Sequence, residues 1–449
     1  MERRKFFKSL VIGGLGATAS PILKAAPPLT STDVKPETNI KDALSIPRTD
    51  SSMPGKYPGR VVRVNHSLAV TDGKPSEETV FEMLKESMLK LTGESDLNKA
   101  WLQFVGKDDV IGLKVNPVAG KLLTTSHAFT QAVVKQLEDA GIPRSNMVIW
   151  DRREMQLYET GYTEENYPGI TITGTECEDA SGSYYNSEGK LYSEERIDKD
   201  HYFYADVEGE YDAYTMPFMV NGGKYSYFTK ICTQKITKII NLPVLKNAGS
   251  SVTLCMKNLA FGSISNTARL HKDLWHETSA YVCAFPPLRD KVVLNIVDGL
   301  IGCFEGGPAA NPQFICNYNT ILVGTDPVAV DRIGHDIVIA KRIEEGIQSE
   351  DKPAALKFMH LAEEIKLGVA NRNKIDLNRS KSSLDEILFP HAFIIAPTFC
   401  SRAILVGYHS RKGAHFCRDR SVWFYEWRFR FISRIWIRKT NNERYKIQG

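Results

Sequence analysis

The sequence has few of the features that mark a metal or redox site. Its eight cysteines are scattered along 449 residues, and no CxxC motif occurs. Iron–sulfur and zinc-ribbon sites need such closely spaced thiolates, so neither pattern is present in this sequence. Most of the cysteines have apolar neighbours, which is typical of small buried side chains. A cofactor therefore remains unassigned from the sequence, and disulfide pairing stays open.

Several enzyme fingerprints are missing as well. No GxSxG, HExxH, P-loop or GxGxxG motif occurs in a strand–turn–helix setting that would give it its function. A basic face is also absent from most of the sequence, because the positive charge is concentrated near its end. Residues 401–449 carry twelve Lys or Arg against three Asp or Glu, and the remainder is mildly acidic. We therefore expect no nucleic-acid partner.

The N-terminus lacks an apolar run of membrane-spanning length, since its charge-free stretch over residues 9–23 has only 15 residues. A helix needs about 20 to cross a bilayer. The preceding segment, MERRKFFK, resembles a bacterial twin-arginine export signal. This resemblance implies a periplasmic protein whose partner is the twin-arginine translocation machinery, which carries folded proteins, often with a cofactor in place. We expect a signal peptide over residues 1–26; cleavage after Ala26 and retention as an anchor both stay open.

The body of the chain alternates between strand and helix patterns. Residues 27–58 are rich in Pro, Ser, Thr and Lys and predict a linker, and the alternation runs from residue 59 to 377. Apolar runs predict strands at residues 59–64, 109–117, 146–151, 236–245, 291–298 and 319–325, and amphipathic periods predict helices at residues 76–91, 126–140, 326–341 and 352–367. This order predicts an α/β fold with a mostly parallel central sheet and helices on both faces.

Two segments break this pattern. Residues 160–230 are rich in Tyr, acidic residues and Gly without a helical period, so we expect a peripheral insertion of hairpins and loops. That insertion forms either a lid over a substrate or ordinary surface β structure. Residues 378–449 are basic and aromatic. Three interpretations of this tail stay open: contact with an anionic membrane surface, an edge strand, or an atypical extension.

Polar side chains gather where the predicted strands end. They are Lys114, Asn116, Asp151, Arg152, Lys246, Lys257, Asn258, Asp298 and Asp326. Open α/β sheets bind ligands at the carboxyl ends of their strands. We interpret Lys246 and Lys257 as catalytic residues that bind an anion or act as a base, with Asp151 and Asp298 as orienting carboxylates. The remaining five, Lys114, Asn116, Arg152, Asn258 and Asp326, are expected to contact the substrate.

A structural interpretation competes with this one. The same charged groups can form ion pairs that hold strand ends to loops, and Asp326 precedes Pro327 as a helix N-cap would. His271 and His276 lie five residues apart with Asp273 between them. They are either a loose metal-binding pair or two solvated or capping histidines.

Five segments in order resemble the DUF362 family, a bacterial and archaeal family named for its unknown function. They are DVIGLKVNP at 109–117, NMVIWDR at 146–152, NLPVLKN…TLCMKNLAFG at 241–262, LNIVDGL at 294–300 and LVGTDPVAVDRIG at 322–334. The resemblance implies an α/β fold and, in some members, an attached ferredoxin-like module, for which this sequence lacks the cysteines. Many members carry a His after the lysine at 246; Asn247 stands here, which argues against a metal ligand at that point. The segment 250–257 is also similar, at the level of fold, to the N-terminal domain of nickel-pincer lactate racemases.

The expected function is that of an exported protein that binds or transforms a small anionic metabolite in a cleft of Lys, Asn and Asp groups, with a metal or organic cofactor loaded before export. The alternative is a non-catalytic ligand-binding or redox-accessory protein. Both use the same residues, and they differ in whether the lysines support turnover or only affinity.

Overall fold

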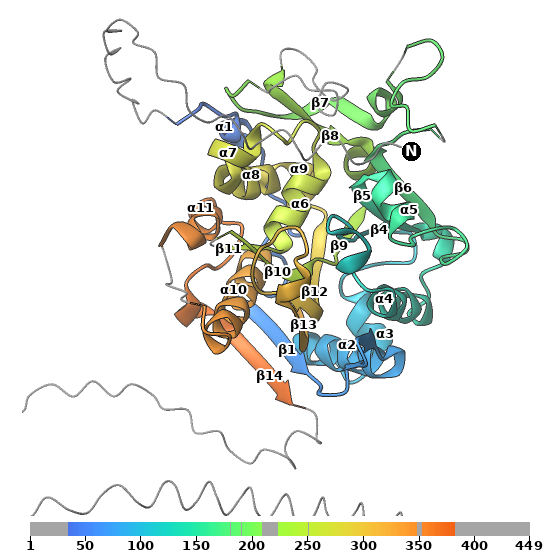
Figure 1. Ribbon diagram of the computed structural model, residues 1–449, viewed down its shortest axis with the longest axis vertical. Coiled ribbons are helices and arrows are strands. Elements are labelled where there is room, and N and C mark those ends of the chain that lie inside the picture. The colour runs from blue at the N-terminus through green and yellow to red at the C-terminus, as the bar shows by residue number, and fades with distance from the viewer. Residues whose placement is uncertain are drawn as a thin grey trace, which may run out of the picture. The chain divides into compact units, whose positions relative to one another are not determined.

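The computed structural model describes residues 35–179, 181–189, 191–208, 223–249, 251–347 and 353–381 (Figure 1). The expected signal peptide over residues 1–26 and the tail beyond residue 381 lie outside these described residues. No helix in the described ranges is long and apolar enough to span a membrane.

The described elements alternate between strands and helices as the sequence predicts. The strands are β1 (Arg60–Asn65), β2 (Val70–Thr71), β3 (Lys74–Pro75), β4 (Ile111–Lys114), β5 (Met147–Arg153), β6 (Thr171–Glu176), β7 (Ile197–Tyr204), β8 (Tyr225–Thr229), β9 (Lys238–Asn241), β10 (Val244–Ala248), β11 (Ser251–Thr253), β12 (Val292–Cys303), β13 (Ile315–Gly324) and β14 (Asp376–Lys381). The helices are α1 (Ile40–Ser45), α2 (Glu77–Thr92), α3 (Leu97–Leu102), α4 (His127–Asp139), α5 (Glu154–Glu159), α6 (Cys255–Ser263), α7 (Leu270–Asp273), α8 (Trp275–Tyr281), α9 (Pro286–Arg289), α10 (Pro327–Glu344) and α11 (Lys357–Glu364).

Ten of the described strands form one sheet. Eight have the order β14-β1-β13-β12-β9-β4-β5-β6, β10 pairs with β12, and β11 pairs with β10. Most neighbours run parallel; β13 is antiparallel to both β1 and β12, and β11 is antiparallel to β10. The prediction of a mostly parallel central sheet is confirmed. Figure 1 shows its strands running through the middle of the molecule with helices on either side.

Each face of the sheet has its own apolar core. Alternate strand residues point to opposite faces. Ile149 therefore belongs to the core that includes residues of α2, α3 and α4, and Trp150 to the core that includes residues of α6, α8, α9, α10 and α11. Helix α2 shows why these helices form: Val80, Met83, Leu84 and other buried residues recur at three- and four-residue spacing on one side. Each such side chain contributes about 1.5–3 kcal/mol on burial. Helices on both faces, as predicted, are confirmed.

The segment before β1 differs from the linker predicted over residues 27–58. From residue 35 onward it packs against the fold: Ala43 in α1 and Met53 are fully buried. The guanidinium of buried Arg289 donates to three backbone carbonyls in and just after α1, at 2.9–3.3 Å. This segment, although rich in Pro and Ser, therefore packs on the fold, and hydrogen bonds from one buried arginine help to hold it there.

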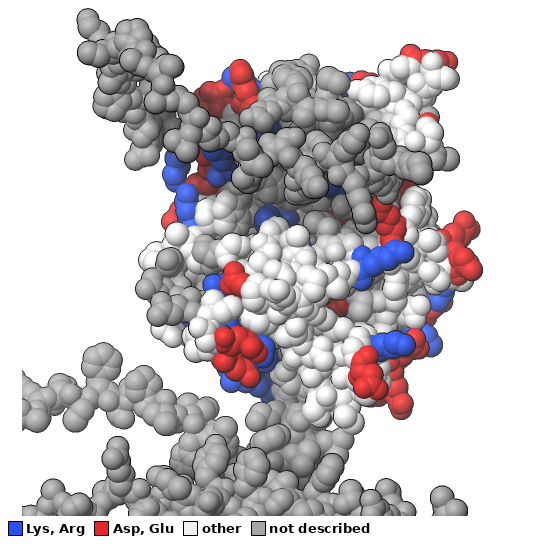
Figure 2. All heavy atoms as spheres, in the orientation of Figure 1, with Lys and Arg blue, Asp and Glu red and all other residues white. Residues whose placement is uncertain are grey.

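The other predicted boundaries also shift. Strand β6 lies within the range predicted as an insertion, residues 160–230, yet it pairs with β5 in the main sheet. The part outside the main sheet is the β7–β8 hairpin with its flanking loops. The last strand, β14, pairs in parallel with β1 through Lys381, so the sheet continues past the domain end predicted at residue 377. On the face drawn in Figure 2, acidic and basic side chains are interspersed.

One irregularity of the sheet positions the candidate site. Strand β9 pairs with both β4 and β12, but after Pro243 the chain continues as β10, which pairs with β12 and β11 and no longer with β4. Pro243 has no N–H to donate to β4, whose last contact with this segment is Leu242 N donating to Lys114 O at 2.8 Å. The end of β4 and the start of β10 therefore diverge, and polar residues lie in the opening.

Candidate functional site

A cavity of about 100 Å³ lies at this opening, at the carboxyl ends of β4 and β5. Fourteen described residues line it: Asn116, Val118, Asp151, Arg152, Arg153, Gln156, Lys246, Thr253, Lys257, Asn258, Phe261, Gly262, His271 and Pro308. Six of the nine predicted strand-end residues are in this group, and a seventh, Lys114, lies directly behind it. None of the described residues of the β7–β8 hairpin lines the cavity.

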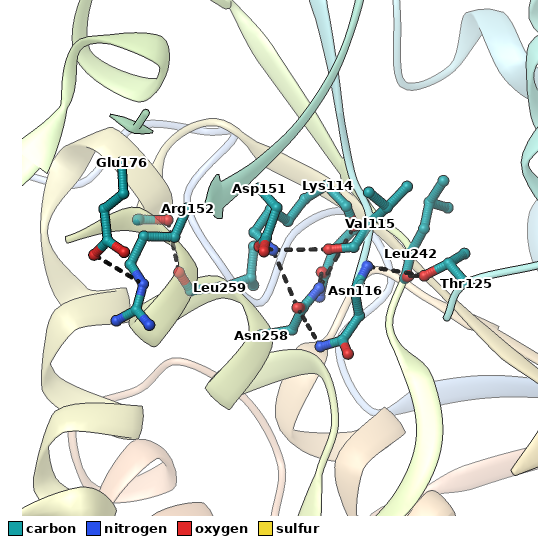
Figure 3. Close-up of polar contacts among 12 residues, drawn as sticks. Lys114, Val115, Asn116, Thr125, Asp151, Arg152, Glu176, Leu242, Asn258 and Leu259 are labelled. Atoms are coloured by element: carbon teal, nitrogen blue, oxygen red, sulfur yellow. Dashed lines mark hydrogen bonds and ion pairs between the residues drawn. The ribbon is translucent and has the colours of Figure 1, made fainter. Parts of the chain in front are cut away.

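The back of the cavity is built around the ammonium of Lys114. This group is fully buried, forms an ion pair with Asp151, and donates to Val115 O at 2.8 Å and to Asn258 Oδ1 at 3.1 Å (Figure 3). Burial lowers the pKa of Lys114, and Asp151 opposes that shift. Because a buried charge that loses its partner costs several kcal/mol, this pair holds the end of β5 and helix α6 to β4.

A row of asparagine side chains continues from this pair into the sheet. Lys246 Nζ donates to Asn116 Oδ1 at 2.8 Å, Asn116 Nδ2 donates to Asn258 Oδ1 at 2.8 Å, and Asn258 Nδ2 donates to Asn241 Oδ1 at 2.8 Å. The row ends with Asn241 Nδ2 donating to Asn295 Oδ1 at 2.9 Å and Asn295 Nδ2 donating to a backbone carbonyl at 3.2 Å. Each amide donates on one side and accepts on the other, so the orientation of every member is fixed by its neighbours.

Lys246 and Lys257 differ from Lys114 in lacking a carboxylate partner among the described residues. Lys246 is fully buried, and its hydrogen bond in the described structure is the one to Asn116. The ammonium of Lys257 lies 5.4 Å from the ring centroids of Phe261 and Trp275. Burial lowers the pKa of each to about 8, and for Lys246 the charge of Lys257 adds to the effect. Lys246 is therefore a buried lysine whose described hydrogen-bond partner is a single amide oxygen.

The arginines at the end of β5 are held by a different carboxylate. Arg152 and Arg153 both pair with buried Glu176 on β6, at 3.2 and 3.0 Å. Arg152 also donates to the hydroxyl of Thr267. The lining therefore contains four cationic side chains and one carboxylate, Asp151, which Lys114 already neutralises.

Two predicted site carboxylates lie elsewhere and bind backbone. Asp298 accepts from Ser126 N at 2.7 Å, at the start of α4, and from Leu300 N at 3.1 Å. Asp326 caps α10 by accepting from Val328 N and Ala329 N, and also accepts from two further backbone N–H groups. Burial raises the pKa of each to about 6. Neither lines the cavity. Asp298 lies inside β12, and Asp326 follows β13, which is antiparallel to β12, so that its C-terminal end is at the opposite edge of the sheet. The capping interpretation of Asp326 fits its contacts.

The structure separates the two predicted metal-ligand histidines. His271 lines the cavity, with Nδ1 2.9 Å from Thr267 O and its ring against Phe261. His276 packs against Trp275 and Phe358, outside the lining, and burial lowers its pKa to about 4. Within the described ranges no group of three His, Cys, Asp or Glu side chains is placed to hold a metal ion.

Sequence reasoning missed several residues that build the site. Asn241 and Asn295 continue the asparagine row, and buried Asp331 accepts from Cys255 N at 2.6 Å and Met256 N at 3.0 Å, which anchors the start of α6. Burial raises the pKa of Asp331 to about 7. The sequence did contain a signal for two of them, a polar residue inside an apolar run: Asn295 in VVLNIV and Asp331 in PVAVDR.

Gly262 is required by the closeness of α6 to Lys114. A Cβ at this position would overlap Lys114 Cε and lie 2.8 Å from Nζ. We expect Gly262→Ala to lower the free energy of unfolding by about 1–3 kcal/mol, because overpacking forces the ammonium from its partners. Denaturant titration measures this change. Gly106→Ala is the control, since its Cβ would meet only Asp109 Oδ2 at 3.6 Å. Equal stability of the two variants would contradict the close packing inferred here.

No curated protein matches the sequence. Among solved structures, a crystal structure of a Thermotoga maritima protein from the Northeast Structural Genomics Consortium is 11% identical, with a TM-score of 0.32. The match covers 59% of this chain and 59% of that chain. A family model described as "Domain of unknown function (DUF362)" matches residues 111–336, half of the chain, and includes the residues on β4, β5, β10 and α6 described above. The chain belongs to the DUF362 family.

Proposed function

We propose that this protein binds a small anion in the cavity between β4, β5, β10 and α6, and that a lysine there exchanges a proton with it. One observation carries the proposal: Lys246 and Lys257 share a cavity without a carboxylate partner among the described residues, whereas Lys114 has Asp151. Removing an ammonium from water is costly unless an opposite charge replaces the lost hydration. A bound anion supplies that charge.

The size of the cavity supports a small ligand. Sites for drug-sized molecules enclose about 300–1,000 Å³, and the volume here is about 100 Å³. A carboxylate or another oxyanion of a few non-hydrogen atoms suits this space, with any remaining part of the molecule extending to solvent. Arg152 adds a planar donor group at the edge, although part of it is engaged by Glu176 and Thr267.

The lowered pKa values support proton transfer as the chemistry. With pKa values of about 8, Lys246 and Lys257 are mixtures of ammonium and amine close to neutral pH. One lysine can then hold the anion as an ammonium while the other accepts a proton as an amine, as in the removal of a proton next to a carboxylate. A non-catalytic binding protein needs only the ammonium that holds the anion.

The N-terminal segment supports a second part of the proposal, export to the periplasm by the twin-arginine machinery. The arginine pair, the short charge-free stretch and the absence of a longer apolar run in the first residues are its basis.

Lys257→Met and Lys246→Met test the anion site. We expect each to weaken binding of acetate or phosphate at least tenfold, since hydrogen bonds to charged groups contribute about 1.5–3 kcal/mol. Isothermal titration calorimetry gives the dissociation constants, and circular dichroism reports whether the fold is retained. Lys272→Met removes an exposed lysine next to cavity residue His271 and is the matched control. A folded Lys257→Met protein with unchanged affinity for both anions contradicts the proposal.

The pH dependence separates anion affinity from stability. Affinity should fall as pH rises through about 8, because the ammonium forms are lost. Without the anion, the free energy of unfolding should instead rise from about pH 8 to 10.5. The two lysines release their protons at lower pH in the folded protein than in the unfolded protein, so the unfolded state binds more protons over this range. Denaturant titrations of the wild type and the Lys246→Met, Lys257→Met double variant isolate this contribution. A double variant with the same stability profile as the wild type would show that the lysines are not depressed in pKa.

Export is tested by changing the arginine pair. Arg3→Lys together with Arg4→Lys should leave the protein in the cytoplasm of a bacterial host that has the twin-arginine machinery, whereas the wild type reaches the periplasm. Cell fractionation and immunoblotting measure the distribution. The single change Lys5→Arg retains the pair and is the control. Equal periplasmic amounts of the paired variant and the wild type would rule out this route.

A further inference from the structure

The β10–β11 hairpin places a threonine directly opposite one of the cavity lysines. These strands are antiparallel, and Lys246 is paired in register with Thr253. Directly opposed residues in an antiparallel pair project from the same face, with Cβ atoms about 4.5–5.5 Å apart. Both residues line the cavity. The hairpin therefore presents an ammonium and a hydroxyl side by side to the same space.

The hydroxyl of Thr253 has no hydrogen-bond partner within the described part of the chain. Thr253 is 7% exposed, and its Oγ1 is buried. Ser251 on the same strand illustrates the usual outcome, because its hydroxyl donates to Ala355 O at 2.6 Å. A buried polar group without a partner costs about 1–3 kcal/mol. An unsatisfied hydroxyl beside an ammonium with unused donors fits a ligand that accepts hydrogen bonds from both.

We propose that Thr253 is a ligand-binding residue, and that its hydroxyl and the Lys246 ammonium each donate to an oxygen of the same carboxylate. This inference rests on the proposed anion site and deepens it, because it names the ligand class. A carboxylate has two oxygens at one end, which two neighbouring donors on adjacent strands can each contact. A halide is a single atom, so both donors would have to converge on one point to bind it, whereas donors on opposed residues of adjacent strands suit two separate oxygens. The pair therefore favours carboxylates over halides.

The test measures binding of formate and of chloride to the wild-type protein and to Thr253→Val, which replaces the hydroxyl with a methyl group of similar size. We expect the dissociation constant for formate to rise about tenfold and that for chloride to change by less than about threefold. Thr253→Ser keeps the hydroxyl and should bind formate within about threefold of the wild type. Thr278→Val is the matched control, because Thr278 on α8 is also buried with an unpartnered hydroxyl but lies outside the cavity lining.

The outcomes separate the two proposals. If the wild type binds formate and a folded Thr253→Val protein binds it equally well, the role of Thr253 is wrong and the anion site stands. If the wild type binds neither formate nor chloride, the carboxylate site fails along with the role of Thr253. Thermal melting verifies folding, and Thr253→Ala is a second variant if the valine protein does not fold. Equal losses of formate and chloride affinity in Thr253→Val would overturn the preference for carboxylates.

Discussion

The burial of the Lys114 ammonium is the constraint on which the rest of this site depends. A charge with no access to water must be paired, and Asp151 at the end of β5 and Asn258 on α6 provide the partners. These contacts fix three elements that are far apart in sequence. They also bring α6 so close to β4 that a Cβ at position 262 would overlap Lys114, and the residue there is glycine. Asp331 holds the same helix from its N-terminal end. With α6 anchored at both ends, Lys257 has a defined place at the cavity.

The structure shows two uses of buried charge side by side. Glu176 holds Arg152 and Arg153, and Asp151 holds Lys114, so these groups offset one another. Lys246 and Lys257 have no carboxylate partner among the described residues, and burial lowers the pKa of each to about 8. Structural ion pairs account for Lys114 and the two arginines, but not for Lys246 and Lys257. These two lysines are therefore the part of the cavity on which the proposed anion site rests.

Part of this arrangement could be predicted from the sequence. Lys114 and Asp151 follow neighbouring parallel strands, whose carboxyl ends meet at one edge of a sheet, so their proximity follows from the fold class. The same rule wrongly places Asp298 and Asp326 in this group. Asp298 lies inside β12, and the end of antiparallel β13 is at the opposite edge of the sheet, so both carboxylates accept from backbone N–H groups instead. Thr253 could not be found this way. Its place opposite Lys246 depends on the register of a three-residue strand, and one residue of slip would turn its side chain to the other face.

The direction of the asparagine row bears on which lysine can act as a base. Asn116 uses its Nδ2 to donate to Asn258, so its Oδ1 is the atom that faces Lys246 and can only accept. An ammonium has three N–H groups, and a neutral amine has two N–H groups and one lone pair. As an ammonium, Lys246 can therefore keep the bond to Asn116 with one N–H and direct another at the proposed carboxylate beside Thr253. Lys257 has no such acceptor among the described residues, since its ammonium lies over the rings of Phe261 and Trp275. Loss of a proton from Lys257 therefore breaks no hydrogen bond of this network, which makes it the better suited of the two to act as the proposed base.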